Sequence, residues 1–440
     1  MGALEDLPEE IPENRQTQED FMNFDDVDFF NDLDLVEDPY PYFEYLRSRG
    51  AVVRLPRHNV VSVTGFDEGV AVMRDHDTFS SINSATGPFP PLPFDPVGDD
   101  INEQLEQHRP NMAFGSMLVA QDPPEHTRSR SLLVGLLTPQ RMKENEEFIK
   151  KTIEGLIDEF IDRGHLEAIS EFAYPLATFT IADLLGVPEE DHGKFLPLLG
   201  KLPGRIGGDD EVENNPMMKV GVYFYEYLCD RRANPRDDVL TKLAQATYTD
   251  GELPPLEVIT THAATMYGAG QDTTVRLIAA MMKTLGENPR LQQQLREDKG
   301  LYTAFIEEVL RLDGPVKSTY RLARKKSLVG DVEVAAGTVV MLTLGAMSRD
   351  PRKFDAPNEF RLDRKGIQQQ LGFGKGVHTC IGAPLARTEA KLALEHILAR
   401  MADIRINETS HGPAGRRHYD YEPNYTQRAL QNIHIDFCKA

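Results

Sequence analysis

The chain has 440 residues, 40% of them hydrophobic, and a formal net charge of −22. The hydrophobic fraction is enough for a large buried core, so the chain as a whole is not disordered. The acidity excludes a general nucleic-acid binder, because affinity for phosphates comes from clustered Lys and Arg, and it disfavours adsorption on an anionic membrane.

The cysteines and the N-terminus indicate the compartment. Cys229, Cys380 and Cys438 are odd in number and far apart, so they predict no disulfide framework and fit a reducing environment. The N-terminus has neither the basic nor the apolar region of a secretory signal. No apolar run reaches the length of about 18 residues that spans a bilayer. We therefore expect a cytoplasmic protein without membrane insertion.

The first half of the chain begins with acidic and loop-like segments. Residues 1–38 are acid-rich, with Arg15 as the single basic residue, and predict a mobile or loosely packed extension before one domain over 39–440. The β-branched residues of 52–64 predict two short strands of a hairpin. The prolines of 87–97 exclude a helix and predict a long loop, a type of segment that often forms a lid.

The remaining segments predict a mainly α fold with a smaller β-rich portion. Helical spacing dominates from 125 to 312, for example over 148–163 and 224–232, with another mobile connection over 202–216. After residue 326 the pattern changes to short strands separated by glycines. A last helix is expected from about residue 383, directly after the segment that contains Cys380.

A long helix with a polar gap in its apolar face is predicted over 256–284. The stripe follows helical steps of three and four at Leu256, Ile259, Ala263, Met266, Ala269, Thr273, Leu277 and Ala280. Gly268 and Gly270 interrupt the same region, each at a cost of about 1 kcal/mol relative to Ala. Either the glycines permit close packing and Thr273 bonds back to a carbonyl one turn earlier, or the helix opens to admit a ligand. In the second case Asp272 and Thr273 stand where protons must be delivered.

Glu308 and Arg311 form a candidate ion pair on the next helix. They lie three residues apart and can pair on the helix surface. Such pairs are usually solvated and worth a fraction of a kcal/mol. Glu308 borders the apolar stripe of Phe305 and Val309, and this is the feature that points to a partly buried network.

The stretch FGKGVHTC, residues 373–380, places a thiol behind two glycines and a histidine. It lacks the spacing of a dinucleotide-binding or phosphate-binding loop. His378 and Cys380 supply only two of the three or four ligands that zinc requires. A nucleophilic cysteine at the start of a helix remains open. A haem-iron thiolate explains more of the loop, because glycines let the backbone approach a flat ring and Phe373 can pack beside it.

These motifs together resemble the cytochrome P450 family. FGKGVHTCIG (373–382) matches the haem-binding signature FGxGxHxCxG, Glu308–Arg311 matches ExxR, and AGQDTT (269–274) matches AGxDTT. The similarity covers roughly residues 35–438. It implies the cytochrome P450 fold, with a large helical domain and a smaller β-rich portion, and the soluble bacterial branch.

The resemblance implies a haem b cofactor and the residues that hold it. Cys380 would be the axial thiolate ligand of the iron, with Phe373 and Gly374 beside the ring. The donors expected to hold the two propionates are His126, Arg130, Arg321 and His378. Glu308 and Arg311 would have a structural role behind the cysteine loop.

The resemblance also implies the residues on the reacting side. Asp272 and Thr273 would deliver protons during oxygen activation, while Ala269 and Gly270 leave room for dioxygen. The segments 87–97 and 195–216 would form the lid over the substrate. The side chains expected beside an apolar substrate are Ala269, Val316, Phe89, Phe94, Met217 and Met218.

The activity implied is that of a monooxygenase. It would hydroxylate or epoxidise a small to medium hydrophobic substrate with O2 and electrons from NAD(P)H, passed on by a ferredoxin reductase and a ferredoxin. The basic residues expected to receive the ferredoxin are Arg128, Arg130, Arg141, Lys375 and Arg387. The alternatives are a peroxygenase that uses hydrogen peroxide and a haem-thiolate sensor without turnover. A monomer is expected.

Overall fold

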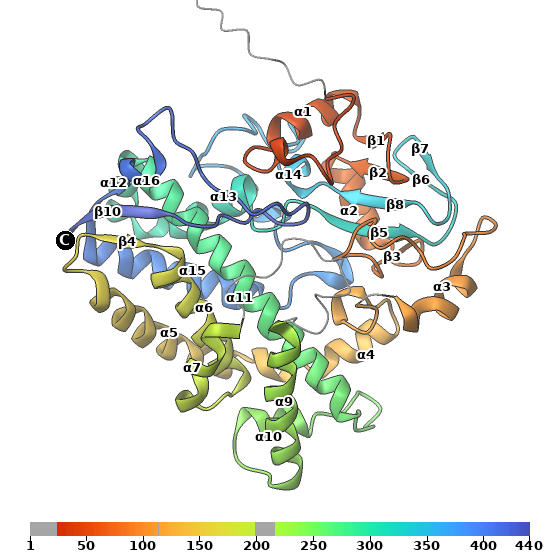
Figure 1. The fold of residues 1–440 in the computed structure, drawn as a ribbon, viewed down its shortest axis with the longest axis horizontal. Helices are drawn as coiled ribbons and strands as arrows, with labels where there is room; N and C mark the ends of the chain where they lie inside the picture. Colours follow the sequence, from red (N-terminus) through yellow and green to blue (C-terminus); the bar gives the residue numbers. More distant parts are fainter. Residues whose placement is uncertain (1–23, 113, 199–215) are drawn as a thin grey trace, which may run out of the picture.

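The computed structural model describes residues 24–112, 114–198 and 216–440 (Figure 1). The architecture is mainly α with three small β-sheets, as predicted. None of the described helices is both long and apolar enough to cross a membrane.

The predicted helices are present, and those expected from residues 256 and 383 begin there, whereas those expected over 148–163 and 224–232 begin several residues earlier. The helices are α1 (Tyr40–Arg49), α2 (Phe66–Arg74), α3 (Asn102–His108), α4 (Glu125–Ser131), α5 (Pro139–Phe160), α6 (Tyr174–Leu185), α7 (His192–Phe195), α9 (Pro216–Ala233), α10 (Val239–Ala244), α11 (Leu256–Glu287), α12 (Pro289–Glu297), α13 (Tyr302–Asp313), α14 (Leu344–Met347), α15 (Ala383–Arg400) and α16 (Glu408–His411).

The strands are short. They are β1 (Val52–Arg54), β2 (Val60–Val63), β3 (Phe79–Ser80), β4 (His165–Glu167), β5 (Thr319–Ala323), β6 (Ser327–Val329), β7 (Val332–Val334), β8 (Val339–Leu342), β9 (Met401–Ile406) and β10 (His434–Lys439). The largest sheet has the order β1-β2-β8-β5-β3, and the others are β4-β10-β9 and β6-β7. The hairpin predicted over 52–64 is present, with Val52 opposite Val63. Every residue of β2 and β8 is buried, which explains the continuous apolar run of β8, and the one polar residue of β2, Ser62, hydrogen-bonds the hydroxyl of Thr343.

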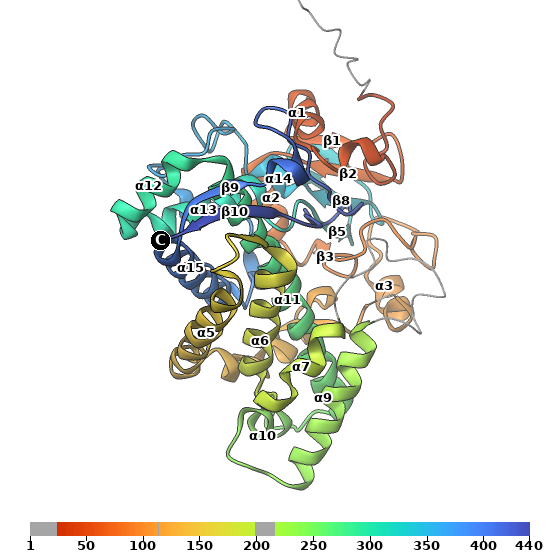
Figure 2. The same ribbon diagram turned by 60° about the vertical axis from the view of Figure 1, so that its left-hand side comes forward.

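Helix α11 runs through the middle of the molecule in both views (Figures 1 and 2), with α6, α9 and α15 packed against it. It is apolar on most sides, and Ile259, Ala263 and Tyr267 are fully buried, as expected for a helix inside a large protein. Gly270 allows α6 to approach, because a β-carbon there would lie 2.9 Å from the Cδ1 of Ile181. The glycines do not interrupt the helix, which stays α-helical from Leu256 to Glu287.

The N-terminal segment corrects one expectation. Residues 1–23 of the predicted acidic extension lie outside the described residues, but 24–38 are not loosely packed. Val27, Phe29, Phe30 and Leu35 are buried against α1, the β1–β2 hairpin and β5. The high acid content hid these apolar residues, so the domain boundary predicted at residue 38 is too late for the described part.

Replacing Phe30 by Ala is expected to lower the free energy of unfolding by about 3–5 kcal/mol, the usual cost of truncating a buried phenylalanine. Leu33 provides the matched control in the same segment, because its side chain is 69% exposed. Leu33→Ala should change the stability by no more than about 0.5 kcal/mol. Denaturant unfolding of both variants measures the difference. Equal effects would mean that the segment does not pack on the fold.

Candidate functional site

The cysteine loop is held in a fixed shape by its backbone. Gly374 and Gly376 have φ angles of +66° and +77°, which glycine adopts without strain. A β-carbon on Gly376 would lie 2.4 Å from the carbonyl oxygen of Met73, at the end of α2. The N–H of Cys380 donates to the carbonyl of Phe373 at 2.9 Å. These constraints place the thiol immediately before the first turn of α15.

Cys380 is exposed at the surface of its loop, although protein surrounds most of its sulfur atom. Its residue surface is exposed, yet burial of the sulfur raises its pKa. The two observations agree if the thiol opens toward one side while protein surrounds the rest. The backbone N–H groups of Gly382 and Ala383 and the charge of Arg130 act in the opposite direction and lower the pKa. The start of α15 therefore offers donors to a negatively charged sulfur.

Four donor side chains converge beside this loop. The rings of His126 and His378 lie 4.0 Å apart between centroids, and both nitrogens of His126 and the Nε2 of His378 are buried without a hydrogen-bond partner. Arg321 is buried and donates to the carbonyl of Tyr320 at 2.6 Å. Arg130 donates to the carbonyl of Thr379 at 2.7 Å. In the described part of the chain none of the four forms an ion pair with a carboxylate.

Their electrostatics indicate what this cluster binds. Burial lowers the pKa of His378 to about 3 and that of His126 to about 4, and the nearby arginines act in the same direction. Burial also lowers the pKa of Arg321 to about 10. The charge of Asp122 acts in the opposite direction on both histidines and on Arg321, but among the described residues it forms no direct ion pair with them, and a bound dianion would supply such a partner. The cluster therefore fits the two propionates of a haem.

Helix α11 is partly open at the predicted polar gap. Ala269 is exposed and Thr273 is half-buried, although the sequence stripe predicted both to be buried. The hydroxyl of Thr273 donates to the carbonyl of Ala269 at 2.8 Å, one turn earlier. The carboxylate of Asp272 is bound by Arg276 through its Nε at 3.0 Å and its terminal nitrogen at 2.7 Å. The predicted proton-delivery pair is thus present, but each side chain bonds elsewhere.

Glu308 and Arg311 form a buried network. Their side chains are fully buried and joined by two hydrogen bonds of 2.7 and 2.8 Å. Arg364 donates to the same carboxylate at 2.8 Å. Arg311 also donates to three carbonyls, those of Ser348, Pro357 and Glu359. The pair therefore ties α13 to the segment that precedes the cysteine loop.

The sequence analysis missed Glu307, the neighbour of Glu308. It is also buried and accepts hydrogen bonds from Arg387 at 2.5 Å and Gln370 at 2.9 Å. The guanidinium of Arg387 lies 4.4 Å from the ring centre of Phe373. Glu307 points away from the apolar stripe of its own helix, so only long-range packing reveals its burial. It joins the segments on both sides of the thiol.

The two phenylalanines expected beside the substrate have aromatic partners within the protein. Phe89 packs edge-on against His58 at 5.0 Å and against Tyr425 at 6.3 Å. Phe94 stacks on His108 at 4.8 Å. Both belong to the hydrophobic cluster of the N-terminal segment and the large sheet, whereas the apolar residues of α11 belong to a separate cluster. The loop 87–97 is non-helical, as predicted, and Phe94 lines a cavity formed by this loop, so the substrate contact of the two rings stays a prediction.

The other residues predicted to contact the substrate differ in their surroundings. Val316 forms an isolated β-bridge with Gln427. Met217 packs against the cluster that contains α11, whereas Met218 is 60% exposed. Of the predicted lid over 195–216, residues 199–215 lie outside the described residues.

The expected ferredoxin surface also needs correction. Arg128 pairs with Asp250 at 3.3 Å and Arg141 with Asp183 at 2.9 Å, so acidic neighbours offset both charges. Arg387 is bound by the buried carboxylate described above. Of the predicted basic residues, Lys375 has no ion pair among the described residues, and Arg74 and Lys353 lie near it.

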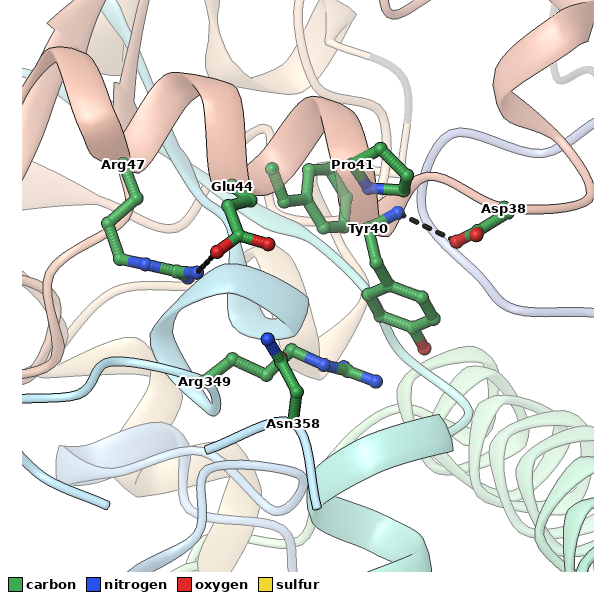
Figure 3. Close-up of a pocket in the computed structure, with 8 residues that line it drawn as sticks. Asp38, Tyr40, Pro41, Glu44, Arg47, Arg349 and Asn358 are labelled. Carbon is green, nitrogen blue, oxygen red and sulfur yellow. Dashed lines mark hydrogen bonds and ion pairs between the residues drawn. The ribbon is translucent and has the colours of Figure 1, made fainter. Parts of the chain in front are cut away.

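A surface pocket lies apart from this site (Figure 3). It is formed by one side of α1, including Tyr40, Glu44 and Arg47, together with Arg349 and Asn358. The Arg349 guanidinium stacks over the Tyr40 ring at 3.6 Å. The pocket contains none of the predicted site residues, so it is not a candidate reaction site.

Comparison with known proteins identifies the family. A family model described as cytochrome P450 matches residues 217–402. Cytochrome P450 144 of Mycobacterium tuberculosis is 31% identical over 390 residues, 86% of each chain. Cytochrome P450 monooxygenase PikC of Streptomyces venezuelae is 30% identical over 381 residues, 85% of this chain and 86% of the relative. The substrate-free structure of Mycobacterium marinum cytochrome P450 CYP150A6 is 49% identical, with a TM-score of 0.90, covering 95% of this chain and 100% of that one.

The chain therefore belongs to the cytochrome P450 family, and its relatives are bacterial. It is an oxidoreductase of the monooxygenase class. Its cofactor is the haem b of this family, whose iron has a cysteine thiolate as axial ligand.

The buried histidines predict a difference in pH dependence between the haem-free and the haem-loaded protein. In the folded haem-free protein His126 and His378 titrate near pH 4 and 3, whereas in the unfolded chain a histidine titrates near about 6.5. Between these values the unfolded state binds more protons, so stability falls as the pH falls from about 6.5 toward 4. In the haem-loaded protein the propionates raise the pKa values of both histidines, so that stability falls less as the pH falls.

Thermal midpoints of both forms between about pH 7.5 and 5.5 measure the two slopes. His262 also has a pKa lowered to about 4 by burial, but it contributes to both forms and cancels in the comparison. Identical slopes would contradict the assignment of the histidine pair to the propionates.

Proposed function

We propose that this chain is a monooxygenase that oxidises a small to medium hydrophobic molecule, with Cys380 as the thiolate ligand of its haem. The bound haem activates O2 with two electrons, so that one oxygen atom enters the substrate and the other leaves as water. The overall balance is R–H + O2 + 2 H⁺ + 2 e⁻ giving R–OH + H2O. The observation that carries the proposal is the convergence of an accessible thiol and four donor side chains that form no ion pair with a carboxylate among the described residues.

The residues around the haem have separate tasks in this proposal. Arg130, Arg321, His126 and His378 bind the propionates and so fix the orientation of the ring. The backbone N–H groups of Gly382 and Ala383 stabilise the thiolate charge. Phe373 and Gly374 lie at the same loop, where an aromatic ring packs and a glycine lets the backbone approach a flat macrocycle.

The residues of α11 supply space and protons. The exposed Ala269 and the adjacent Gly270 leave room beside the haem. Thr273 positions the proton donor, and Asp272 brings protons from the protein interior. Both side chains must change partners to do so, because Thr273 bonds to its own helix and Asp272 to Arg276. Val316 and Met217 are the proposed apolar substrate contacts.

The proposed electron route is NAD(P)H, a ferredoxin reductase and a ferredoxin. Arg74, Lys353 and Lys375 are the basic group that supports it. Burial lowers the pKa of Lys375, and the neighbouring charges of Arg74 and Arg387 act in the same direction. Among the described residues Arg74, Lys353 and Lys375 form no ion pair, so their charge is available to an acidic partner and speeds its association. Lys375 lies within the cysteine loop, which keeps the route to the haem short.

The alternatives predicted from the sequence are less well supported. A peroxygenase has less need of a proton relay, and a sensor without turnover needs neither a relay nor an electron partner. The presence of Asp272 and Thr273 and of the basic group favours the monooxygenase. Terpenoids, small aromatics and fatty acids remain the candidate substrates. The cytoplasmic location and the monomeric state stay predictions.

Thr273→Ala tests the proposed proton delivery. A substrate is first chosen from terpenoids, aromatics and fatty acids by its shift of the haem Soret band. The variant should bind it unchanged but form product about 10²-fold more slowly, the lower range for a lost acid–base group. NAD(P)H consumption should continue, with release of hydrogen peroxide.

Thr265→Ala is the matched control, because Thr265 donates to the carbonyl of Thr261 at 2.7 Å and thus makes the same backbone bond on the same helix. Its product yield should equal that of the wild type. Unchanged product formation in Thr273→Ala would remove the proposed role of Thr273 and favour the peroxygenase.

A further inference from the structure

The carboxylate of Asp272 has a third partner from a distant part of the chain. Besides the two hydrogen bonds from Arg276, it accepts one from the Nε2 of Gln427 at 2.7 Å. The side chains of Asp272 and Arg276 are 14% and 7% exposed, so the contact is mostly shielded from water. A hydrogen bond to a charged group in such surroundings is stronger than one between neutral groups.

Gln427 belongs to the segment 421–430, here named the C-terminal loop. Its two ends are paired, because Tyr421 forms a β-bridge with Leu430 and the N–H of Glu422 donates to the carbonyl of Ala429 at 2.8 Å. The loop is therefore closed at its base.

The same loop is joined to residues 315–318, here named the Val316 segment. The N–H groups of Lys317 and Ser318 donate to the carbonyl of Thr426 at 2.9 and 3.1 Å, and the N–H of Arg428 donates to the carbonyl of Pro315 at 2.9 Å. Val316 itself is bridged to Gln427. The backbone of Gln427 is thus held by the Val316 segment while its amide holds Asp272.

We propose that Gln427 is a positioning residue that ties the Asp272 carboxylate to the Val316 segment, so that a substrate seated against Val316 controls the orientation of the carboxylate that supplies protons. This inference rests on the proposed function, because it uses the roles given there to Asp272 and Val316.

Glu422 lowers the electrostatic cost of a change in the orientation of the Asp272 carboxylate. Its carboxylate lies 3.6 Å from the guanidinium of Arg276, on the same loop as Gln427. When Asp272 turns away, Arg276 keeps an acidic neighbour and no buried charge is left alone, which would otherwise be strongly destabilising. Two acceptors for one guanidinium allow two arrangements of similar energy, as a switching element requires.

The first test measures the contact itself in the haem-loaded protein without turnover. Thermal midpoints are compared for wild type, Gln427→Leu, Asp272→Ala and the double variant. Gln427→Leu should lower the midpoint when Asp272 is present and have little further effect when Asp272 is replaced, because residues in contact are not additive. A full, undiminished effect in the Asp272→Ala background would overturn the proposed contact.

The second test measures proton delivery. Gln427→Leu should keep the substrate-induced Soret shift, since the backbone bonds to the Val316 segment remain, and should change the dissociation constant only by the size of the coupling, which is reciprocal. It should lower the product formed per NAD(P)H several-fold and change the solvent deuterium isotope effect on product formation. A purely structural role would move the midpoint and leave the isotope effect as in the wild type.

Gln431→Leu is the matched control. It lies next to the same loop, and its amide donates to the backbone carbonyl of Tyr421 at 3.3 Å rather than to Asp272. Its coupling and isotope effect should equal those of the wild type. Wild-type coupling and a wild-type isotope effect in Gln427→Leu would overturn the inference but not the proposed monooxygenase activity. If the wild type forms no O2-dependent product, the proposed function and the catalytic part of this inference are overturned. The thermal midpoints of the four proteins still show whether Gln427 and Asp272 are in contact.

Discussion

Two adjacent buried carboxylates on α13 hold the surroundings of the thiol together. Glu308 binds Arg311 and Arg364, and through Arg311 it reaches three backbone carbonyls of the segment before the cysteine loop. Glu307 binds Gln370 before that loop and Arg387 after it. Removing one partner of such a buried pair costs about 3–5 kcal/mol, because the other charge is left without compensation. The position of Cys380 therefore depends on charges that never take part in the reaction.

The proposed proton delivery depends on α11. Around Ala269 and Thr273 the helix is open, and the adjacent Asp272 is bound away from Thr273. The resting structure thus keeps the proton-delivery pair apart. Proton delivery that comes too early wastes electrons as hydrogen peroxide. A link between Asp272 and the C-terminal loop would delay the assembly of the relay until a substrate is bound.

Local patterns in the sequence were sufficient for the elements and for the residues of the motifs. The prolines and the apolar stripe predicted α11 to within a few residues, and the glycines predicted the turns between the short strands. Contacts between distant segments were beyond such patterns. The burial of Glu307 depends on α15 and on the segment before the cysteine loop, and the bond from Gln427 to Asp272 joins residues 155 positions apart. The ring partners of Phe89 were beyond local patterns for the same reason, because they come from the N-terminal and C-terminal parts of the chain.

The central claim is that Cys380 binds the haem iron as a thiolate. The most direct test is the absorption spectrum of the dithionite-reduced, CO-treated protein, recorded for wild type, Cys380→Ala and the two control variants Cys229→Ala and Cys438→Ala. We predict a strongly red-shifted Soret band in the wild type and in both controls, and its loss in Cys380→Ala. Retention of the band in Cys380→Ala, or its absence from folded, haem-loaded wild-type protein, would contradict the account.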